Sequence, residues 1–151
     1  KSVEKKYGKD VDIWLFGSDD VRNVVDENYL AFNWRQLGKL TQVQVASMMS
    51  KADIFTDFSS HQAMGLSALE AMAAGCSVIV PKNGGAVEFI NHKINGIVAD
   101  TSMNQASQLA LEELIEDDGL RQQLQINGMR DVVQYYPERV SYNILATLFI
   151  I

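Results

Sequence analysis

Residues 53–88 read DIFTDFSSHQAMGLSALEAMAAGCSVIVPKNGGAVE. An apolar strand-like run is followed by a loop, a short helical segment, a second apolar run and a loop with a glycine pair. This order of strands and helices is typical of a parallel α/β sheet. Ligands of such sheets bind at the carboxyl ends of the strands. We therefore expect the loops 59–64 and 82–85 to lie at one edge and to form a binding site there.

The same alternation of strand and helix extends over the rest of the chain, and it predicts an α/β fold. We expect a Rossmann-like parallel sheet flanked by helices, with further helices at the C-terminal end. Strands are expected at 11–16, 29–33, 53–58, 77–80 and 97–99, and helices after Thr41 and at 65–74, 86–90, 102–114, 120–126, 129–133 and from 137 onwards. Two capping boxes are expected, Thr41 with Gln44 and Ser102 with Gln105. The apolar end of the chain, from Leu145 to Ile151, is expected to be a packed C-terminal helix.

The composition narrows the classes of function. The chain has 151 residues, of which 47% are hydrophobic, and this is enough for one domain with a core. Its net charge of −6 argues against a nucleic-acid partner, because phosphate backbones require clustered Lys and Arg. The single cysteine, Cys76, is expected to be a small buried hydrophobe rather than a nucleophile. The two histidines have no Cys, Asp or Glu at ligand spacing, so no metal site is expected.

The first loop and the helix behind it suit a ligand with phosphates and hydroxyls. Gly65 allows close backbone approach, and the N–H groups of Met64, Gly65 and Leu66 would lie at the positive end of the helix dipole. Helical periodicity places Glu70 at the margin of a buried face, whose expected members are Leu66, Leu69, Met72 and Ala73. An ionised carboxylate there can accept hydrogen bonds from two neighbouring hydroxyls of a sugar or ribose.

The second loop supplies further candidates. Gly84 and Gly85 would allow close approach and offer N–H donors, and Lys82 could meet a phosphate. Glu88 is expected at the start of a short helix, and His61 in the first loop could donate to a sugar oxygen or a phosphate. A solvated surface position remains the alternative for Lys82 and His61. For Glu88 the alternative is a charge that only complements the dipole at the start of its helix.

These motifs resemble the C-terminal, donor-binding half of GT-B glycosyltransferases, the glycosyl transferases group 1, and specifically the retaining group called family 4. The resemblance lies in ADIFTDFSSHQAMGLSALEAMAAGCSVIVPKNGGAVEFI (52–90) and NGIVAD (95–100), and more loosely in VDIWLFGSDD (11–20) and TQVQVASMMSKAD (41–53). It covers almost the whole chain.

The resemblance implies roles for individual residues. The family has two glutamates with seven residues between them; Glu70 matches the second, which holds the ribose hydroxyls of the nucleotide. The first lies at the donor sugar near the reacting centre, and this chain has Gln62 there. Glutamine keeps the hydrogen bonding and loses the negative charge. The family's Gly-Phe-Gly is replaced by Ala63-Met64-Gly65.

The resemblance also implies an activity, which is transfer of a sugar from a nucleotide-diphosphate sugar to a glycan or lipid-linked acceptor, with retention and without a cofactor. We expect residues 1–151 to be a single nucleotide-sugar-binding domain, truncated at its N-terminus and inactive alone. The first strand and an acceptor-binding N-terminal domain would be missing. Contacts to the base are expected from 17–20, including Gly17, and from 32–35. We expect a cytoplasmic location, with the missing half at the inner face of the membrane, and a role in surface polysaccharide synthesis.

Two alternatives remain from the sequence. A non-catalytic GT-B relative, used for binding or scaffolding, would explain the glutamine at position 62. A nucleotide-sugar epimerase has the same architecture, and its acid/base residues come partly from the other half of the molecule.

Overall fold

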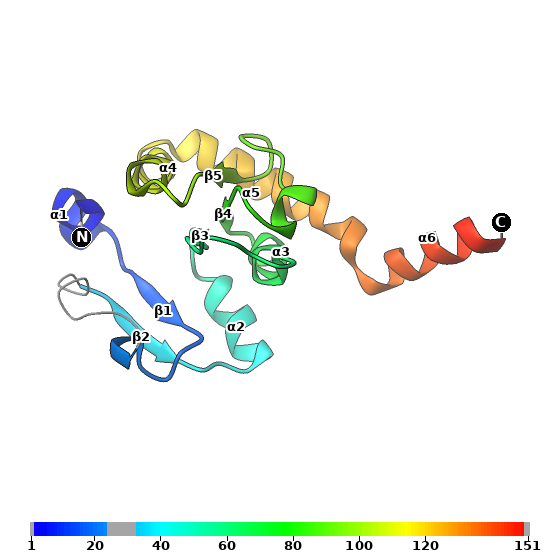
Figure 1. Cartoon of the computed structure of the whole chain (residues 1–151), viewed down its shortest axis with the longest axis horizontal. Coiled ribbons are helices and arrows are strands. Elements are labelled where there is room, and N and C mark those ends of the chain that lie inside the picture. Colours follow the sequence, from blue (N-terminus) through cyan, green and yellow to red (C-terminus); the bar gives the residue numbers. More distant parts are fainter. Residues whose placement is uncertain (1, 24–32, 150–151) are drawn as a thin grey trace. The chain divides into compact units, whose positions relative to one another are not determined.

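The structure is a computed structural model that describes residues 2–23 and 33–149. The chain divides into two compact units, residues 1–48 and residues 49–151 (Figure 1). Of the predicted strand 29–33, residues 29–32 lie outside the described part of the chain. The prediction of a single nucleotide-sugar-binding domain stays a prediction.

The first unit contains a short parallel sheet. Helix α1 (Ser2–Tyr7) and a 3-10 turn (Gly8–Asp10) precede β1 (Trp14–Phe16), which pairs in parallel with β2 (Arg35–Gly38). A second 3-10 turn (Val21–Asn23) follows β1. The predicted strand 11–16 is therefore confirmed over its second half, whereas β2 was not predicted.

Helix α2 (Gln42–Met49) begins with the capping box that the sequence predicts. The Thr41 N–H donates to Gln44 Oε1 at 2.9 Å, and the Gln44 N–H donates to Thr41 Oγ1 at 3.4 Å. Each side chain thus satisfies a backbone donor at the start of the helix.

The second unit contains a parallel sheet of β3 (Ile54–Thr56), β4 (Ser77–Pro81) and β5 (Ile97–Ala99), in that order. Helix α3 (Leu66–Ala73) connects β3 to β4, and a 3-10 turn (Gly85–Glu88) follows β4 where a helix over 86–90 was expected. The parallel α/β class is confirmed, with its strands distributed over two sheets.

Strand β4 lies at the centre of the sheet, and all of its residues are buried. Helices α4 (Asn104–Glu116) and α5 (Asp118–Val132) pack against it. The core that they share with the sheet includes Ile79, Ile97, Ala99, Ala110, Leu114 and Leu124. A continuous apolar run such as 78–81 is expected for a parallel strand that is covered on both faces.

Two predictions about α4 and α5 are wrong. Ser102 does not cap a helix, because its Oγ donates to Asp100 Oδ1 at 2.5 Å and α4 begins two residues later, after Met103. Helix α5 is continuous where two helical pieces were expected. It passes through Gly128, which is buried and whose added β-carbon would lie 3.5 Å from Met72 Cγ. Close packing on α3 therefore outweighs the low helix propensity of glycine, which is about 1 kcal/mol.

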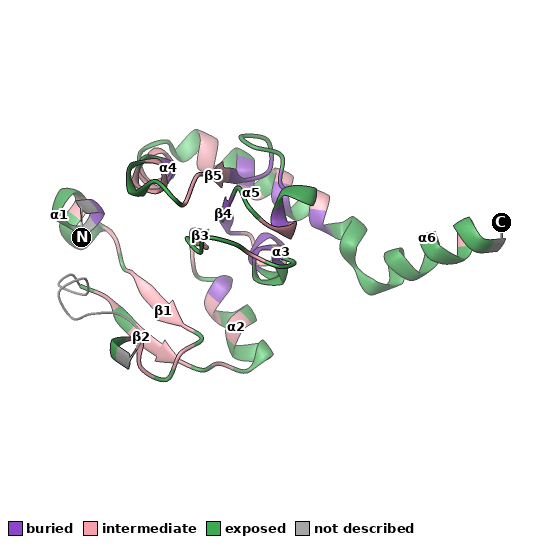
Figure 2. Ribbon diagram, in the orientation of Figure 1, coloured by how far each residue is buried: buried purple, intermediate pink, exposed green. Residues whose placement is uncertain are grey.

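Helix α6 (Pro137–Phe149) begins at Pro137 as predicted, but it does not pack as predicted. Leu145 is 50% exposed and Leu148 is 69% exposed. Figure 2 shows exposed residues along nearly the whole helix. Its apolar side chains therefore have little cover within the described chain. None of the described helices has the length and apolar character needed to cross a membrane.

Candidate functional site

The structure brings the loops after β3 and β4 together, as the sequence predicts. The Gln62 N–H donates to the Asn83 carbonyl at 3.1 Å, and the Gly85 N–H donates to the Gln62 carbonyl at 2.9 Å. Gln62 and Gly84 form an isolated parallel bridge. The two loops are thus joined by backbone hydrogen bonds beyond the carboxyl ends of β3 and β4.

The glycine pair allows the two loops to approach each other. Gly84 has φ +126°, and a β-carbon there would lie 1.8 Å from the Gln62 carbonyl oxygen. A β-carbon on Gly85 would lie 2.3 Å from the Ala63 carbonyl oxygen. The Gly85 N–H already donates to the carbonyls of Gln62 and Ala63, so it is not the open donor that the sequence suggested.

The start of α3 presents unused backbone donors. Gly65 precedes the helix with φ +74°, and no side chain caps the helix. None of the N–H groups of residues 64–67 has an acceptor among the described residues. Met64 and Leu66 are 65% and 60% exposed beside these groups. Open N–H groups at the positive end of a helix favour an anionic group.

Glu70 is more exposed than the sequence predicted. The buried face of α3 consists of Ala68, Ala71 and Met72, whereas Leu66 and Ala73 are exposed together with Glu70. Small alanines let α3 approach β4 and α5 closely, so the helix turns its larger Leu66 outward. Among the described residues, no side chain or backbone group binds the Glu70 carboxylate. Its oxygens are therefore open acceptors one helical turn from the start of α3.

Gln62 makes a contact that was not predicted from the sequence. Its Nε2 donates to Asp57 Oδ2 at 2.5 Å, and its Oε1 is buried without a hydrogen-bond partner. Asp57 lies just after β3 and also accepts from the Ser59 N–H at 2.9 Å. The sequence did contain a sign of this contact, since Asp57 is an acidic residue directly after an apolar strand. That position lies at the carboxyl end of a strand, where ligands of parallel sheets bind.

Lys82 has an ion-pair partner that was not predicted from the sequence either. Its Nζ lies 2.6 Å from Asp100 Oδ2, just beyond β5. Hydrogen bonds from Lys82 and, second, from Ser102 hold the pKa of Asp100 below its ordinary value. A phosphate at Lys82 would have to compete with this carboxylate.

The remaining candidates of the two loops lie at the surface. His61 is exposed, and its backbone carbonyl accepts from Ser59 Oγ at 3.2 Å. Glu88 is exposed and ends the 3-10 turn Gly85–Glu88, where the sequence predicted a helix start. Their assigned roles stay predictions.

Gly17 belongs to the unit of residues 1–48. It follows β1 with φ +93°, and its N–H donates to the Gly38 carbonyl at 2.9 Å. This bond continues the pairing of β1 with β2 at the start of the loop that was expected to contact a base. Of the second expected segment, 32–35, residue 32 lies outside the described part of the chain.

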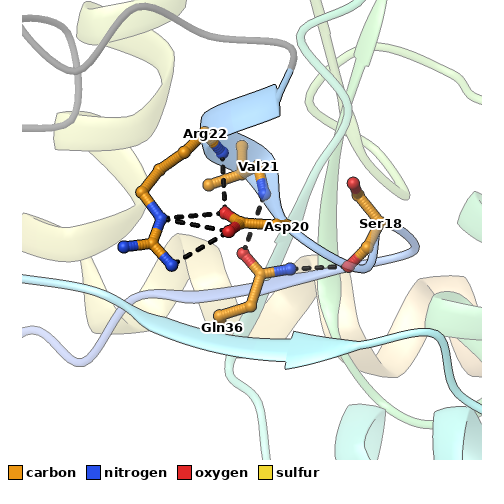
Figure 3. Close-up of polar contacts among 5 residues, drawn as sticks. All are labelled: Ser18, Asp20, Val21, Arg22 and Gln36. Atoms are coloured by element: carbon orange, nitrogen blue, oxygen red, sulfur yellow. Dashed lines mark hydrogen bonds and ion pairs between the residues drawn. The ribbon is translucent and has the colours of Figure 1, made fainter.

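Gln36 holds the rest of that loop in place (Figure 3). Its Nε2 donates to the Ser18 carbonyl at 2.6 Å, and its Oε1 accepts from the Val21 N–H at 3.3 Å. Asp20 pairs with the Arg22 guanidinium, and these hydrogen bonds lower the pKa of Asp20. The side chains of Gln36 and Asp20 thus bind the loop itself.

Cys76 is buried, as predicted. Its Sγ donates to the Met49 carbonyl at 3.2 Å. Burial and then the nearby Asp53 carboxylate raise the pKa of the thiol to about 11. A thiol of that kind is a poor nucleophile at neutral pH. Over residues 2–23 and 33–149, no group of three His, Cys, Asp or Glu side chains is placed to hold a metal ion.

The sequence of the chain matches one protein family and is similar to a glycosyltransferase of an archaeon. Residues 8–131 match the family described as glycosyl transferases group 1. An uncharacterised glycosyltransferase of Methanocaldococcus jannaschii is 29% identical over 126 residues, which are 81% of this chain and 32% of that protein. The chain therefore spans about a third of this relative's length.

Solved structures agree with this family. The C-terminal domain of a glycosyl transferase group 1 protein from Francisella tularensis has a TM-score of 0.61 and 27% identity, covering 90% of this chain and 65% of that one. HepE of Anabaena in complex with UDP has a TM-score of 0.73 at 21% identity, covering 99% of this chain and 38% of that one, which is a likeness of fold alone. The protein thus belongs to the glycosyl transferases group 1 family and has the α/β fold of GT-B glycosyltransferases.

Proposed function

We propose that this chain is the donor-binding part of a glycosyltransferase and binds a nucleotide-diphosphate sugar at the start of α3. The observation that carries the proposal is the combination of open N–H groups at residues 64–67 with the unpartnered carboxylate of Glu70 on the same exposed side of the helix. Diphosphate oxygens accept hydrogen bonds and ribose hydroxyls donate them, so one nucleotide would satisfy both groups. HepE, a neighbour in fold, has been solved with UDP and with UDP-glucose.

In this proposal the N–H groups of residues 64–67 bind the diphosphate, and Glu70 binds the ribose. Gln62 and the loop with Gly84 and Gly85 face the donor sugar. Negative charge develops on the departing diphosphate during transfer, and the open N–H groups would stabilise it. We further propose transfer of a hexose with retention, as in family 4.

The complete enzyme would need an acceptor-binding domain, because the chain spans only about a third of the length of the Methanocaldococcus jannaschii relative. The exposed apolar side of α6, including Leu145 and Leu148, favours such a partner domain, since exposed patches of this kind mark interaction surfaces. The acceptor would be a glycan or a lipid-linked sugar in cytoplasmic polysaccharide synthesis. Residues 1–151 would then be a donor half, inactive alone.

A non-catalytic binding role is the second candidate, and Gln62 favours it. The position near the donor sugar has a neutral amide, and its Nε2 is bound to Asp57 instead of being free for a ligand. Such a protein would still bind the nucleotide and would not transfer the sugar.

Isothermal titration of the chain with UDP, UDP-glucose and GDP tests donor binding. We expect Glu70→Gln to weaken binding of the preferred nucleotide about tenfold, because one charge-assisted hydrogen bond to ribose is lost. Glu138→Gln on α6 is the matched control and should bind like the wild type. If no nucleotide binds, or if Glu70→Gln binds as the wild type does, the proposal fails.

A turnover assay separates the two candidates, once nucleotide binding is established. Transfer by the complete protein that contains this chain supports the enzyme. Transfer that appears only after Gln62→Glu supports the non-catalytic relative.

A further inference from the structure

Asp57 and Gln62 form a pair at the carboxyl end of β3. The Gln62 Nε2 donates to one carboxylate oxygen of Asp57, and the other oxygen accepts from the Ser59 N–H. An ionised carboxylate can only accept, so the Gln62 amide must turn its NH₂ group toward Asp57 and its carbonyl away. Asp57 therefore decides the orientation of the amide.

The side-chain carbonyl of Gln62 is an unsatisfied hydrogen-bond acceptor close to the start of α3. Gln62 Oε1 is buried without a partner, and a β-carbon on Gly65, at the start of α3, would lie 2.9 Å from it. Gln62 as a whole is partly buried, and His61 and Ala63 on either side of it are exposed. Since buried acceptors are normally paired, a group that donates a hydrogen bond is favoured there.

We propose that Asp57 is a positioning residue for Gln62, and that the two together replace the single glutamate that is absent from position 62. With its NH₂ group bound to Asp57, Gln62 offers only an acceptor, as a glutamate would. Asp57 supplies the negative charge that Gln62 lacks. This inference rests on the proposed function, because the donor that meets Gln62 is then a hydroxyl of the nucleotide sugar.

The pair makes a glutamate at position 62 unfavourable in this chain. Gln62→Glu would bring two carboxylates into contact, and such a pair holds one proton more tightly than a single carboxyl does. The other titratable groups on the loops that pack here are His61, Glu88 and the Lys82–Asp100 ion pair, and none of them changes in the variants. The swapped variant Asp57→Asn/Gln62→Glu restores one charge and one amide.

Urea unfolding of the chain between pH 4 and pH 8 tests the pair. Relative to the wild type, we expect Gln62→Glu to raise the unfolding equilibrium constant at pH 7 about tenfold or more, and to approach the wild type near pH 4. The swapped variant should stay within about threefold of the wild type at both pH values. Gln123→Glu, an exposed glutamine on α5, is the control for added charge.

Two results of this measurement would contradict the proposed pairing of Asp57 with Gln62. One is that Gln62→Glu behaves like Gln123→Glu at every pH. The other is that the swapped variant is as unstable as Gln62→Glu. If Gln62→Glu does not fold at pH 7, its folding at pH 4 gives the same comparison.

Binding of UDP and of UDP-glucose tests the positioning role. We expect Asp57→Asn to weaken UDP-glucose binding about tenfold and to leave UDP binding unchanged, because only the sugar meets Gln62. Equal binding of UDP-glucose by Asp57→Asn and the wild type would overturn the role. If the wild type binds neither compound, the donor function fails together with the positioning role, whereas the unfolding data still decide whether the pair exists.

Discussion

Gly84 stands so close to Gln62 that a β-carbon on it would lie 1.8 Å from the Gln62 carbonyl oxygen. This approach fastens the loop after β4 to the loop after β3, with the Gln62 N–H bound to the Asn83 carbonyl. The geometry of both loops, and therefore of the start of α3, depends on the absence of a side chain at Gly84.

Gly84→Ala should destabilise the chain strongly. The added carbon meets backbone, which cannot move without breaking the bridge between the loops, and the φ of +126° is unfavourable for alanine. We expect a loss of about 3 kcal/mol or more in the free energy of unfolding, measured in urea. Gly75→Ala is the control, because its φ is +91° and its nearest neighbour is Met129 Sδ at 3.6 Å. It should lose only about 1 kcal/mol, so equal losses would contradict the steric explanation.

Lys82→Gln should raise the pKa of Asp100, because the hydrogen bond from Lys82 is the first cause that holds it low. Ser102→Ala should raise it less. Because the pKa of Asp100 is lowered in the folded chain, this carboxylate stabilises the fold at pH values above its ordinary pKa of 3.8. This stabilisation is lost as the pH falls through the pKa of the folded state. Carbon NMR titration of the Asp100 carboxyl measures both shifts. Lys39→Gln, which removes the ion pair with Asp19, should leave Asp100 unchanged.

Cys76 should react slowly with a disulfide reagent at pH 8, and quickly only after unfolding in urea. Burial raises the pKa of its thiol from 9.0 to about 11, so the folded chain keeps a proton that the unfolded chain loses in this range. The thiol of Cys76 therefore contributes fully to the free energy of unfolding below pH 9, and this contribution falls as the pH rises toward 11. Cys76→Ala should lack this part of the pH dependence. Equal reaction rates in the folded and unfolded chain would contradict a buried thiol.

Leu124→Ala should cost about 2–5 kcal/mol in the free energy of unfolding, because its side chain is fully buried between α5 and the sheet. Leu148→Ala on α6 should cost less than about 0.5 kcal/mol, because that side chain is mostly exposed. Thermal or urea unfolding measures both. A large loss for Leu148→Ala would mean that α6 packs against another surface in solution.

The sequence predicts most of the second unit well. The strand 97–99 has the predicted bounds, and β4 extends the predicted strand 77–80 by one residue. Short apolar runs between turn residues carry this information locally. Helix α3 is also close to its predicted range, since Gly65 and Gly75 flank it in the sequence.

The orientation of α3 was not predictable in the same way. Of the four residues expected on the buried face, Met72 is buried and Leu69 is partly buried, whereas Leu66 and Ala73 are exposed. Ala68 and Ala71 are buried in their place. A helical wheel ranks faces by hydrophobicity, whereas packing against β4 and α5 favours small residues that allow close contact. Glu70 consequently lies on an open surface.

Local patterns in the sequence determined the α/β class, the two loops that follow β3 and β4, the start of α3 and the acidic residue on it. Tertiary contacts decided the partners of the polar groups, namely Asp57 with Gln62, Lys82 with Asp100 and the Gly85 N–H with the Gln62 carbonyl. Periodicity describes one segment at a time, but these partners meet because parallel pairing of β3, β4 and β5 aligns the ends of segments that are far apart in the chain. That alignment leaves Glu70 and the N–H groups of residues 64–67 without partners in the described chain, and it places a carboxylate beside the amide at position 62.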